Sequence, residues 1–313
     1  MKHVDPSAFP GAEIVPTSQA LGRVTASPAI AAISSPHFHS AAMDGFAIRA
    51  QDSFGAGPDR PIRFKLGTTA WPVNTGRPIP PGTDAVVMIE DADFVGEDSF
   101  EIDKGLVPWQ YVRRVGEDFV VSEMILPARH LINPYDQGAL LAGGVFDVKV
   151  VEKPRVVLVP TGNELVSAES LKDRQPHVGE AIEFNSVMLT GLVERTGGSA
   201  HSTDIVPDDF DALRTAVKSA AESDAHMVVI LAGSSAGSED FTAAVIRGLG
   251  ELLVHGVAMM PGKPTILGIV NGKPILGNPG YPVSAVLSFE LFGLPVLDAM
   301  LGRPRRNRPS ITA

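Results

Sequence analysis

The second half of the chain alternates two patterns, and this alternation constrains the fold more than any other feature. Continuous apolar runs occur at RVVLVPTG (155–162) and MVVILAG (227–233). Such runs are typical of parallel strands that are buried on both faces, which requires helices on either side of the sheet. Amphipathic patterns follow each run, so residues 153–302 are predicted to form a three-layer α/β/α domain.

Local signals place the other elements of this domain. A helix is expected from Asn185, acting as its cap, to the Gly197-Gly198 pair, and another from Pro207-Asp208 onward. A strand is expected near 201–206. Asn271-Gly272 between two apolar runs predicts a tight hairpin. The apolar segment 283–301 predicts a closing helix that is interrupted or kinked near Pro295.

The first half has a different pattern. Short β-type runs are separated by turn residues, which predicts a β-rich, partly extended region over residues 1–152. One helix is expected over 135–144, ending at Gly143 or Gly144. The β-type runs lie at 61–67, 84–91, 99–103, 109–115 and 147–151.

Composition excludes several classes of protein. The formal net charge of −10 argues against a nucleic-acid-binding surface. The absence of cysteine excludes disulfides, cysteine-ligated metals and a thiol nucleophile. No signal-peptide pattern and no apolar run of about 20 residues are evident, so a soluble cytoplasmic protein without a membrane partner is expected. The basic tail 303–313 is expected to be solvated chain.

Unusual loops follow the predicted strands. In open α/β sheets ligands bind at the carboxyl ends of the strands. Loops rich in Gly, Ser, Asn or Pro stand at 160–164, 232–240 and 277–284, and a Pro-Gly-Lys-Pro turn stands at 261–264. A single loop of this kind would serve as a simple connection, but four in one domain favour a ligand site.

The loop 232–240 has the composition of an anion cradle. Its glycines allow a ligand to approach the backbone closely, its serines add donors, and a helix from Asp240 onward presents free N–H groups. Asp240 and Glu164 at neighbouring strand ends are the candidate Mg²⁺ ligands, because Mg²⁺ favours one or two carboxylates together with phosphate oxygens and water.

Other motifs fail. Neither a phosphate-binding P-loop nor a dinucleotide fingerprint is present. Residues 233–237 match G-x-S-x-G, but His255 is the only histidine after them, and its spacing excludes the triad of a serine hydrolase. His37 and His39 lack a third nearby ligand and are interpreted as ordinary loop histidines.

Several motifs, in a fixed order along nearly the whole chain, resemble the molybdopterin molybdenumtransferase family (MoeA and the corresponding domain of gephyrin). They include SAAMDGFA (40–47), NTGRPIPPGTDAVV (74–87) and TGNEL (161–165). The remaining matching segments are 35–36, 116–118, 154–155, 233–241, 261–264 and 279–284.

The resemblance implies an elongated homodimer. Domains I and II would lie in the first half and the molybdopterin-binding domain III in the second. It also implies that adenylylated molybdopterin and molybdate yield molybdenum cofactor and AMP, with Mg²⁺ as cofactor. The molybdopterin adenylyltransferase is the candidate protein partner.

The resemblance also assigns roles to individual residues. Asp44 and Thr75 would reach the site from the other subunit, and Glu164 and Asp240 would hold the metal. Lys263 would contact the anionic ligand. These five form the predicted catalytic set, and the predicted binding residues are Thr161, Gly162, Gly233, Ser234, Ser235, Gly237, Pro261, Gly262, Pro279, Gly280 and Ser284.

The chain departs from the family pattern at several positions. Asn163 stands where an aspartate is common, and Met260 stands where a lysine is often found. Asn278 and Tyr281 replace the usual Leu and Asn. The family's small C-terminal domain IV has no counterpart within these 313 residues. These departures keep an alternative open, a non-catalytic module that binds molybdopterin or molybdenum cofactor as a carrier or regulator.

Overall fold

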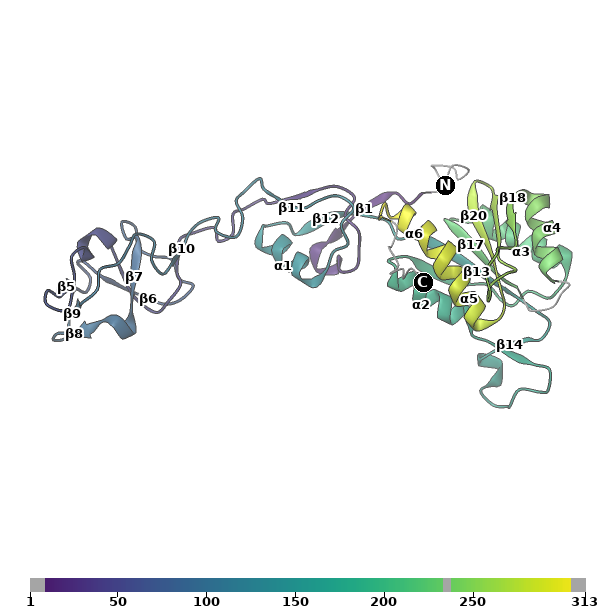
Figure 1. Ribbon diagram of the computed structural model, residues 1–313, viewed down its shortest axis with the longest axis horizontal. Helices are drawn as coiled ribbons and strands as arrows, with labels where there is room; N and C mark the ends of the chain where they lie inside the picture. Colours follow the sequence, from purple (N-terminus) through teal and green to yellow (C-terminus); the bar gives the residue numbers. More distant parts are fainter. Residues whose placement is uncertain (1–8, 233–237, 305–313) are drawn as a thin grey trace, which may run out of the picture.

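The computed structural model describes residues 9–232 and 238–304. These residues form three units in a line, with an α/β domain at one end, a small middle unit and a β-rich unit at the far end (Figure 1). The prediction of an α/β domain preceded by a β-rich, partly extended region is confirmed.

A six-stranded sheet forms the centre of the α/β domain. Its strand order is β16-β13-β17-β20-β19-β18, and β19 alone runs antiparallel to its neighbours. The strands are β13 (Arg155–Thr161), β16 (Ser199–Ser202), β17 (Met227–Ala232), β18 (Gly250–His255), β19 (Ile266–Val270) and β20 (Lys273–Asn278). The two apolar runs occupy β13 and β17, side by side in the middle of the sheet.

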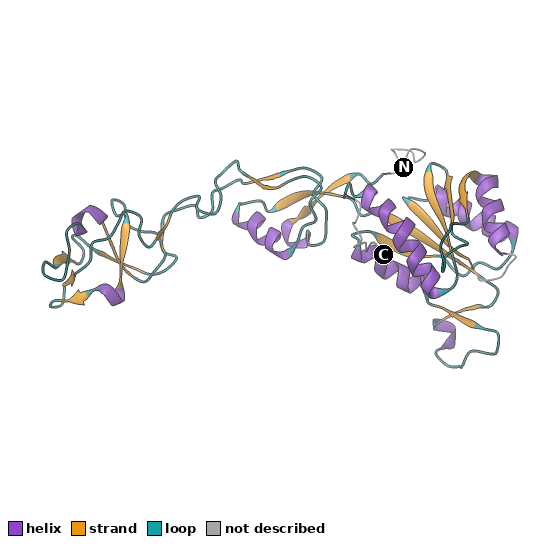
Figure 2. Cartoon of the chain, in the orientation of Figure 1, coloured by secondary structure: helices purple, strands orange, loops and turns teal. Residues whose placement is uncertain are grey.

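Helices cover both faces of this sheet (Figure 2). Alternate residues of β13 face opposite sides, so Val157 packs with Leu213 in one core and Val156 packs with Leu189 in the other. The first core contains α3 (Phe210–Glu222) and α4 (Ser238–Leu249). The second contains α2 (Asn185–Arg195), the π-helix η6 (Phe289–Gly293) and α6 (Leu294–Met300). Helix α5 (Pro282–Ser288) contacts α2 and β20.

One helix prediction needs correction, and the predicted interruption of the closing helix is confirmed. The residue that caps α2 is Phe184, and Asn185 is the first helical residue. The side chain of Asn185 donates to the Gly280 carbonyl instead of capping. The closing helix is interrupted at η6, before Pro295, which lies in the first turn of α6. A Cβ on Gly293 would lie 2.4 Å from the Phe289 ring, so close packing accompanies the π-helical turn.

Two strand predictions also change. The strand expected near 201–206 is β16, at Ser199–Ser202, followed by a single bridge from Val206 to Thr161. Within 109–115 only Val112–Arg113 is a strand, because Trp109 and Tyr111 adopt positive φ values of 69° and 57° and make a turn.

The predicted hairpin is confirmed between β19 and β20. Asn271 and Gly272 have φ values of 50° and 73°. Both central residues therefore lie in the left-handed region that a type I′ turn requires, which asparagine and glycine adopt at low cost.

The helical segment Pro282–Met300 is the one stretch in the described part of the chain that is long and apolar enough for a bilayer, with a mean hydropathy of 1.6. Half of the most apolar stretch of this segment is buried. Phe289, Leu294 and Leu297 pack against the sheet, so the segment is a core helix of the α/β domain.

The extended part of the molecule is built from two antiparallel legs of the chain. The outgoing leg contains β1 (Ala12–Pro16), β2 (Ala29–Ile30) and β3 (Ser40–Ala41), and the returning leg contains β10 (Val112–Arg113), β11 (Met124–Leu126) and β12 (Asp147–Val151). These strands pair as β1–β12, β2–β11 and β3–β10. The far unit is therefore carried on a two-stranded stalk (Figure 1).

The far unit contains two three-stranded sheets. Phe46, Phe64 and Phe100 stack between them, with ring centroids 4.6 and 5.7 Å apart. One sheet has β4 (Gly45–Ile48), β6 (Trp71–Val73) and β7 (Ala85–Met88), and the other has β5 (Ile62–Lys65), β8 (Asp93–Phe94) and β9 (Ser99–Ile102). A further pair, β14 (Leu165–Ser167) and β15 (Ala181–Glu183), projects from the α/β domain (Figure 1).

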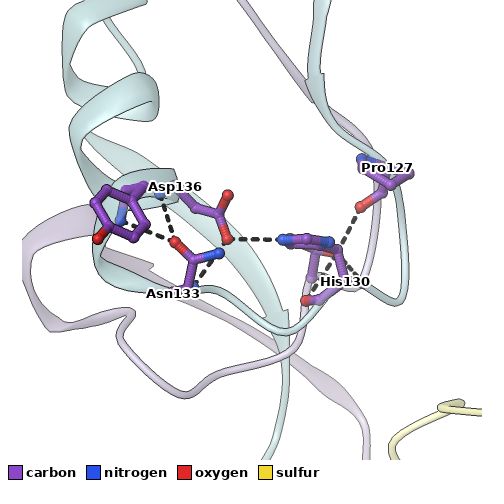
Figure 3. Close-up of polar contacts among 6 residues, drawn as sticks. Pro127, His130, Asn133 and Asp136 are labelled. Atoms are coloured by element: carbon purple, nitrogen blue, oxygen red, sulfur yellow. Dashed lines mark hydrogen bonds and ion pairs between the residues drawn. The ribbon is translucent and has the colours of Figure 1, made fainter.

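Helix α1 (Pro134–Ala142) packs in the middle unit and ends at Gly143, as predicted. A capping box starts it, because the Asn133 side chain accepts from the Asp136 N–H and Asp136 accepts from the Asn133 N–H. The same Asp136 carboxylate contacts His130 Nε2 at 2.7 Å (Figure 3). The buried Thr25 of the outgoing leg donates to the Pro127 carbonyl, which ties the two legs together.

Burial of His226 makes the stability of the α/β domain depend on pH. Its Nδ1 accepts from the Arg155 N–H at 2.9 Å, and burial, reinforced by the Arg155 charge, lowers the pKa of His226 below 6.5. The unfolded chain therefore takes up the proton first as the pH falls. Stability should be complete above pH 6.5 and decline as the pH falls through the lower folded-state pKa.

Substitution of His226 by Asn should remove this contribution. The free energy of unfolding, measured in urea at pH 8 and pH 5.5, should fall less for His226→Asn than for the wild type over that interval. Equal losses in both proteins would show that His226 is not the titrating group.

Candidate functional site

Two adjacent cavities lie at the carboxyl ends of the central strands. The Lys263 cavity has a volume of 220 Å³ and is walled mainly by residues 260–264 and 277–281. The Glu164 cavity has a volume of 230 Å³ and is walled mainly by residues 164–165 and 181–185. Gly280 and Tyr281 line both cavities, so the turn after β20 separates them.

The loop after β13 contributes the carboxylate of Glu164. Gly162 has a φ of 155°, and a Cβ there would lie 2.8 Å from a Glu164 carboxylate oxygen. The glycine thus lets the Glu164 side chain fold back over the backbone at the end of the strand. Thr161, at the last position of β13, is buried.

Asp208 belongs to the same loop cluster, although its place in the sequence predicts only the start of a helix. Its carboxylate accepts from the Asn163 N–H at 3.3 Å and lies 3.5 Å from the Thr161 hydroxyl. Its own N–H donates to Asn163 Oδ1 at 3.1 Å. A carboxylate therefore lies beside Asn163. The Asp-Asp pair directly after an expected strand was the signal available in the sequence.

Lys263 stands on a turn that is fixed from two sides. Its carbonyl accepts from the Val257 N–H, and the neighbouring Gly262 carbonyl accepts from the Thr265 hydroxyl at 2.8 Å. Thr265 also bonds to the buried Ser288 of α5. Met260 lies at the rim of the cavity with 88% of its surface exposed, so an apolar side chain occupies a position next to the cationic one.

The other predicted binding residues of this region have defined places. Pro261, Gly262, Pro279, Gly280 and Ser284 all line the Lys263 cavity. Gly233, Ser234, Ser235 and Gly237 lie outside the described residues. Asp240 falls in α4, and only its backbone position is described.

The metal pair predicted from the sequence remains a prediction. No group of three or more His, Asp or Glu side chains arranged to hold a metal ion occurs within residues 9–232 and 238–304. The Glu164 cavity does contain a second carboxylate, that of Glu183, which accepts from the Ser186 N–H at 2.9 Å. One or two carboxylates are enough for Mg²⁺ when a phosphate substrate and water complete its shell, so this donor set fits Mg²⁺.

Asp44 and Thr75 contact each other in the far unit. The Thr75 N–H and hydroxyl both donate to Asp44 Oδ1, at 2.7 and 3.0 Å. These bonds, that of the backbone first, lower the pKa of Asp44 below 3.8 and keep it ionised. Gly45 lets the strand pack closely here, because a Cβ would lie 1.9 Å from the Val87 carbonyl.

The structure does not bring this pair to the cavities within one chain. The unit that carries β6 and β7 and the α/β domain stand at opposite ends of the molecule, with the middle unit between them (Figure 1). Four of the five predicted catalytic residues thus fall into two groups, Asp44 with Thr75 and Lys263 with Glu164. The fifth, Asp240, lies on α4 of the α/β domain.

Two family models match the chain. Residues 2–144 match the MoeA N-terminal region (domain I and II). Residues 157–299 match a probable molybdopterin binding domain.

Named relatives cover nearly the whole chain. A putative molybdopterin biosynthesis protein of Methanocaldococcus jannaschii is 37% identical over 286 residues, which are 88% of this chain and 71% of that protein. Molybdopterin molybdenumtransferase 2 of Mycobacterium tuberculosis is 35% identical over 324 residues, 96% of this chain and 78% of the relative. A solved structure of a molybdopterin biosynthesis moeA protein from Pyrococcus horikoshii matches with a TM-score of 0.77 and 30% identity, covering 97% of this chain and 77% of that one.

Replacement of Thr75 by Val should raise the pKa of Asp44 toward 3.8, because one of the two hydrogen bonds to the carboxylate is lost. The backbone N–H remains, so the pKa should stay below 3.8. NMR titration of the carboxyl group measures the change, and Thr75→Ser is the matched control that keeps the hydroxyl. A pKa unchanged by Thr75→Val would refute the assigned bond.

Proposed function

The chain belongs to the MoeA family of molybdopterin molybdenumtransferases, and we propose that it inserts molybdate into adenylylated molybdopterin, with Mg²⁺ and with release of AMP. One observation carries this proposal. A cation and a carboxylate, Lys263 and Glu164, line neighbouring cavities at the carboxyl edge of the sheet, separated by a single turn. A substrate with both phosphate and metal-binding groups needs this combination.

Because the protein is acidic overall, binding of an anionic substrate depends on positively charged groups within the site. The chain carries a net charge of −10, so its overall field opposes an anionic substrate. Lys263, fixed on its turn, places a positive charge where phosphate or molybdate oxygens would bind. In the proposed reaction water cleaves the phosphoanhydride bond and AMP leaves. The two sulfur atoms of the pterin replace two oxygens of molybdate, which leave as water, and molybdenum cofactor is formed.

Glu164 is the residue that would hold Mg²⁺, with Asp240 as the second ligand carried over from the resemblance. Bound Mg²⁺ supplies charge neutralisation at phosphate oxygens and at the leaving AMP. The protein's own part is to orient the carboxylate, which Gly162 allows by leaving room above the backbone.

We further propose a homodimer. Apolar side chains are widely exposed on the middle unit, among them Ile14 (71%), Tyr135 (87%) and Phe146 (67%). Exposed apolar surface of this kind is typical of an interface. Pairing through this unit would let the far unit of one subunit deliver Asp44 and Thr75 to the cavities of the other.

The remaining assignments follow from this reaction. The molybdopterin adenylyltransferase is proposed as the supplier of the adenylylated substrate. A cytoplasmic location is proposed because the one long apolar helix of the described chain lies against the sheet.

The proposal is tested by measuring AMP release from adenylylated molybdopterin with and without molybdate and Mg²⁺, beside direct binding of the same ligand. Release should require both ions. Glu164→Gln should bind the ligand yet reduce release about tenfold or more, because a bound metal ion contributes several kcal/mol of charge stabilisation and a neutral amide holds it less well. Glu169→Gln, on the projecting segment, is the control. Binding by the wild type without any release would overturn the transferase reaction and leave a binding module.

Removal of the Lys263 charge should weaken binding of the pterin phosphate. Lys263→Ala is expected to raise the Kd about 10- to 100-fold at low salt, because a hydrogen bond to a charged group contributes about 1.5–3 kcal/mol. Calorimetric titration measures the effect. Lys218→Ala, whose exposed partner is Glu222 on α3, is the matched control. An unchanged Kd would remove Lys263 from the site.

A further inference from the structure

Two buried side-chain oxygens lack a hydrogen-bond partner in the described part of the chain, and both lie at the turn between the two cavities. They are Oδ1 of Asn185 and Oδ1 of Asn278. Asn185 begins α2 and Asn278 ends β20, so they come from different elements and reach this turn from two sides. Asn278 is only 1% exposed.

The amide nitrogens of both residues already donate hydrogen bonds, one to the turn and the other to α5, which follows it. Asn185 Nδ2 donates to the Gly280 carbonyl at 2.7 Å, and Asn278 Nδ2 donates to the Ala285 carbonyl at 3.1 Å. Rotating either amide by half a turn would place its oxygen against a carbonyl oxygen. The orientation of each amide is therefore fixed, and each oxygen is left as an acceptor.

Each of the two asparagines belongs to the wall of one cavity, with its oxygen buried behind the cavity surface. Asn185 lines the Glu164 cavity, and Asn278 lines the Lys263 cavity. A buried acceptor without a donor destabilises a fold, and nearly all such groups in native proteins are paired. Two such acceptors flank one turn here. Hydrogen-bond donors of a bound ligand would supply the partners that they lack.

The chemistry of such a ligand can be stated. Lys263 only donates hydrogen bonds, whereas the two asparagine oxygens only accept them. A fully ionised oxyanion satisfies Lys263 but has no donor for the asparagines. A ligand that satisfies all three has an anionic group and also N–H groups.

We propose that Asn185 and Asn278 accept hydrogen bonds from the N–H groups of an amino-substituted heterocycle and thereby determine specificity for the organic part of the substrate. This role rests on the proposed function and is separate from that of Lys263, which binds the oxyanion. The pterin ring and the adenine of the adenylylated substrate share this donor chemistry.

The test compares Asn278→Leu with the wild type. Leucine has a similar size and removes both the unpaired oxygen and the hydrogen bond to the Ala285 carbonyl. The two effects oppose each other, so the Tm of the ligand-free protein should change little. Affinity for adenylylated molybdopterin should fall about tenfold or more, while affinity for molybdate alone should not change. Lys263→Ala, by contrast, should lower the affinity for molybdate alone.

Asn185→Ala provides a second variant from the other side of the turn, and it keeps the inference testable if Asn278→Leu does not fold. Binding of unsubstituted pterin and of AMP to each variant distinguishes the two sources of N–H donors. The heterocycle whose affinity falls is the one that the altered residue contacts.

Two results would overturn the inference. If the variants have a lower Tm and unchanged affinity for every ligand, the asparagines have a structural role only. If they have a higher Tm and unchanged affinity, the two oxygens do not bind a ligand. Both results differ from failure of the proposed function, in which the wild type itself would not bind adenylylated molybdopterin.

Discussion

The pairing of the outgoing and returning legs is the constraint on which the rest of the structure depends. β1–β12, β2–β11 and β3–β10 join the legs at three points, and Thr25 adds side-chain bonds between them. A two-stranded stalk of this kind keeps the far unit away from the α/β domain. Asp44 and Thr75 are therefore separated from Lys263 and Glu164 within one chain, and the proposed homodimer would bring them together from two subunits.

At the other end of the molecule, the turn after β20 organises both cavities. Gly280 and Tyr281 line each of them, and the amides of Asn185 and Asn278 fix the backbone from opposite sides. The same bonds that hold the turn leave two acceptors at its flanks. Stability of the turn and recognition of a ligand thus involve the same two side chains.

Much of the α/β domain was predictable because its signals are local. The apolar runs at β13 and β17, the Asn271-Gly272 turn and the order of the motifs all appear within short windows of sequence. The exact position of a break in a helix is harder to predict. Pro295 is a clear local signal, but the π-helical turn lies before it, at Phe289–Gly293, where Gly293 packs against the Phe289 ring. The sequence also identified Lys263 and Glu164 as candidates, since they stand next to expected strands.

The sequence by itself determined the three-layer domain, the hairpin and the family, because periodicity and motif order are properties of the chain alone. Only the tertiary structure decided which distant residues meet. Asp208 bonds to Asn163, and Asn185 bonds to Gly280 instead of capping its helix. The physical reason is that parallel strands bring loops together at one edge of the sheet, and no local pattern encodes which side chains will be neighbours there.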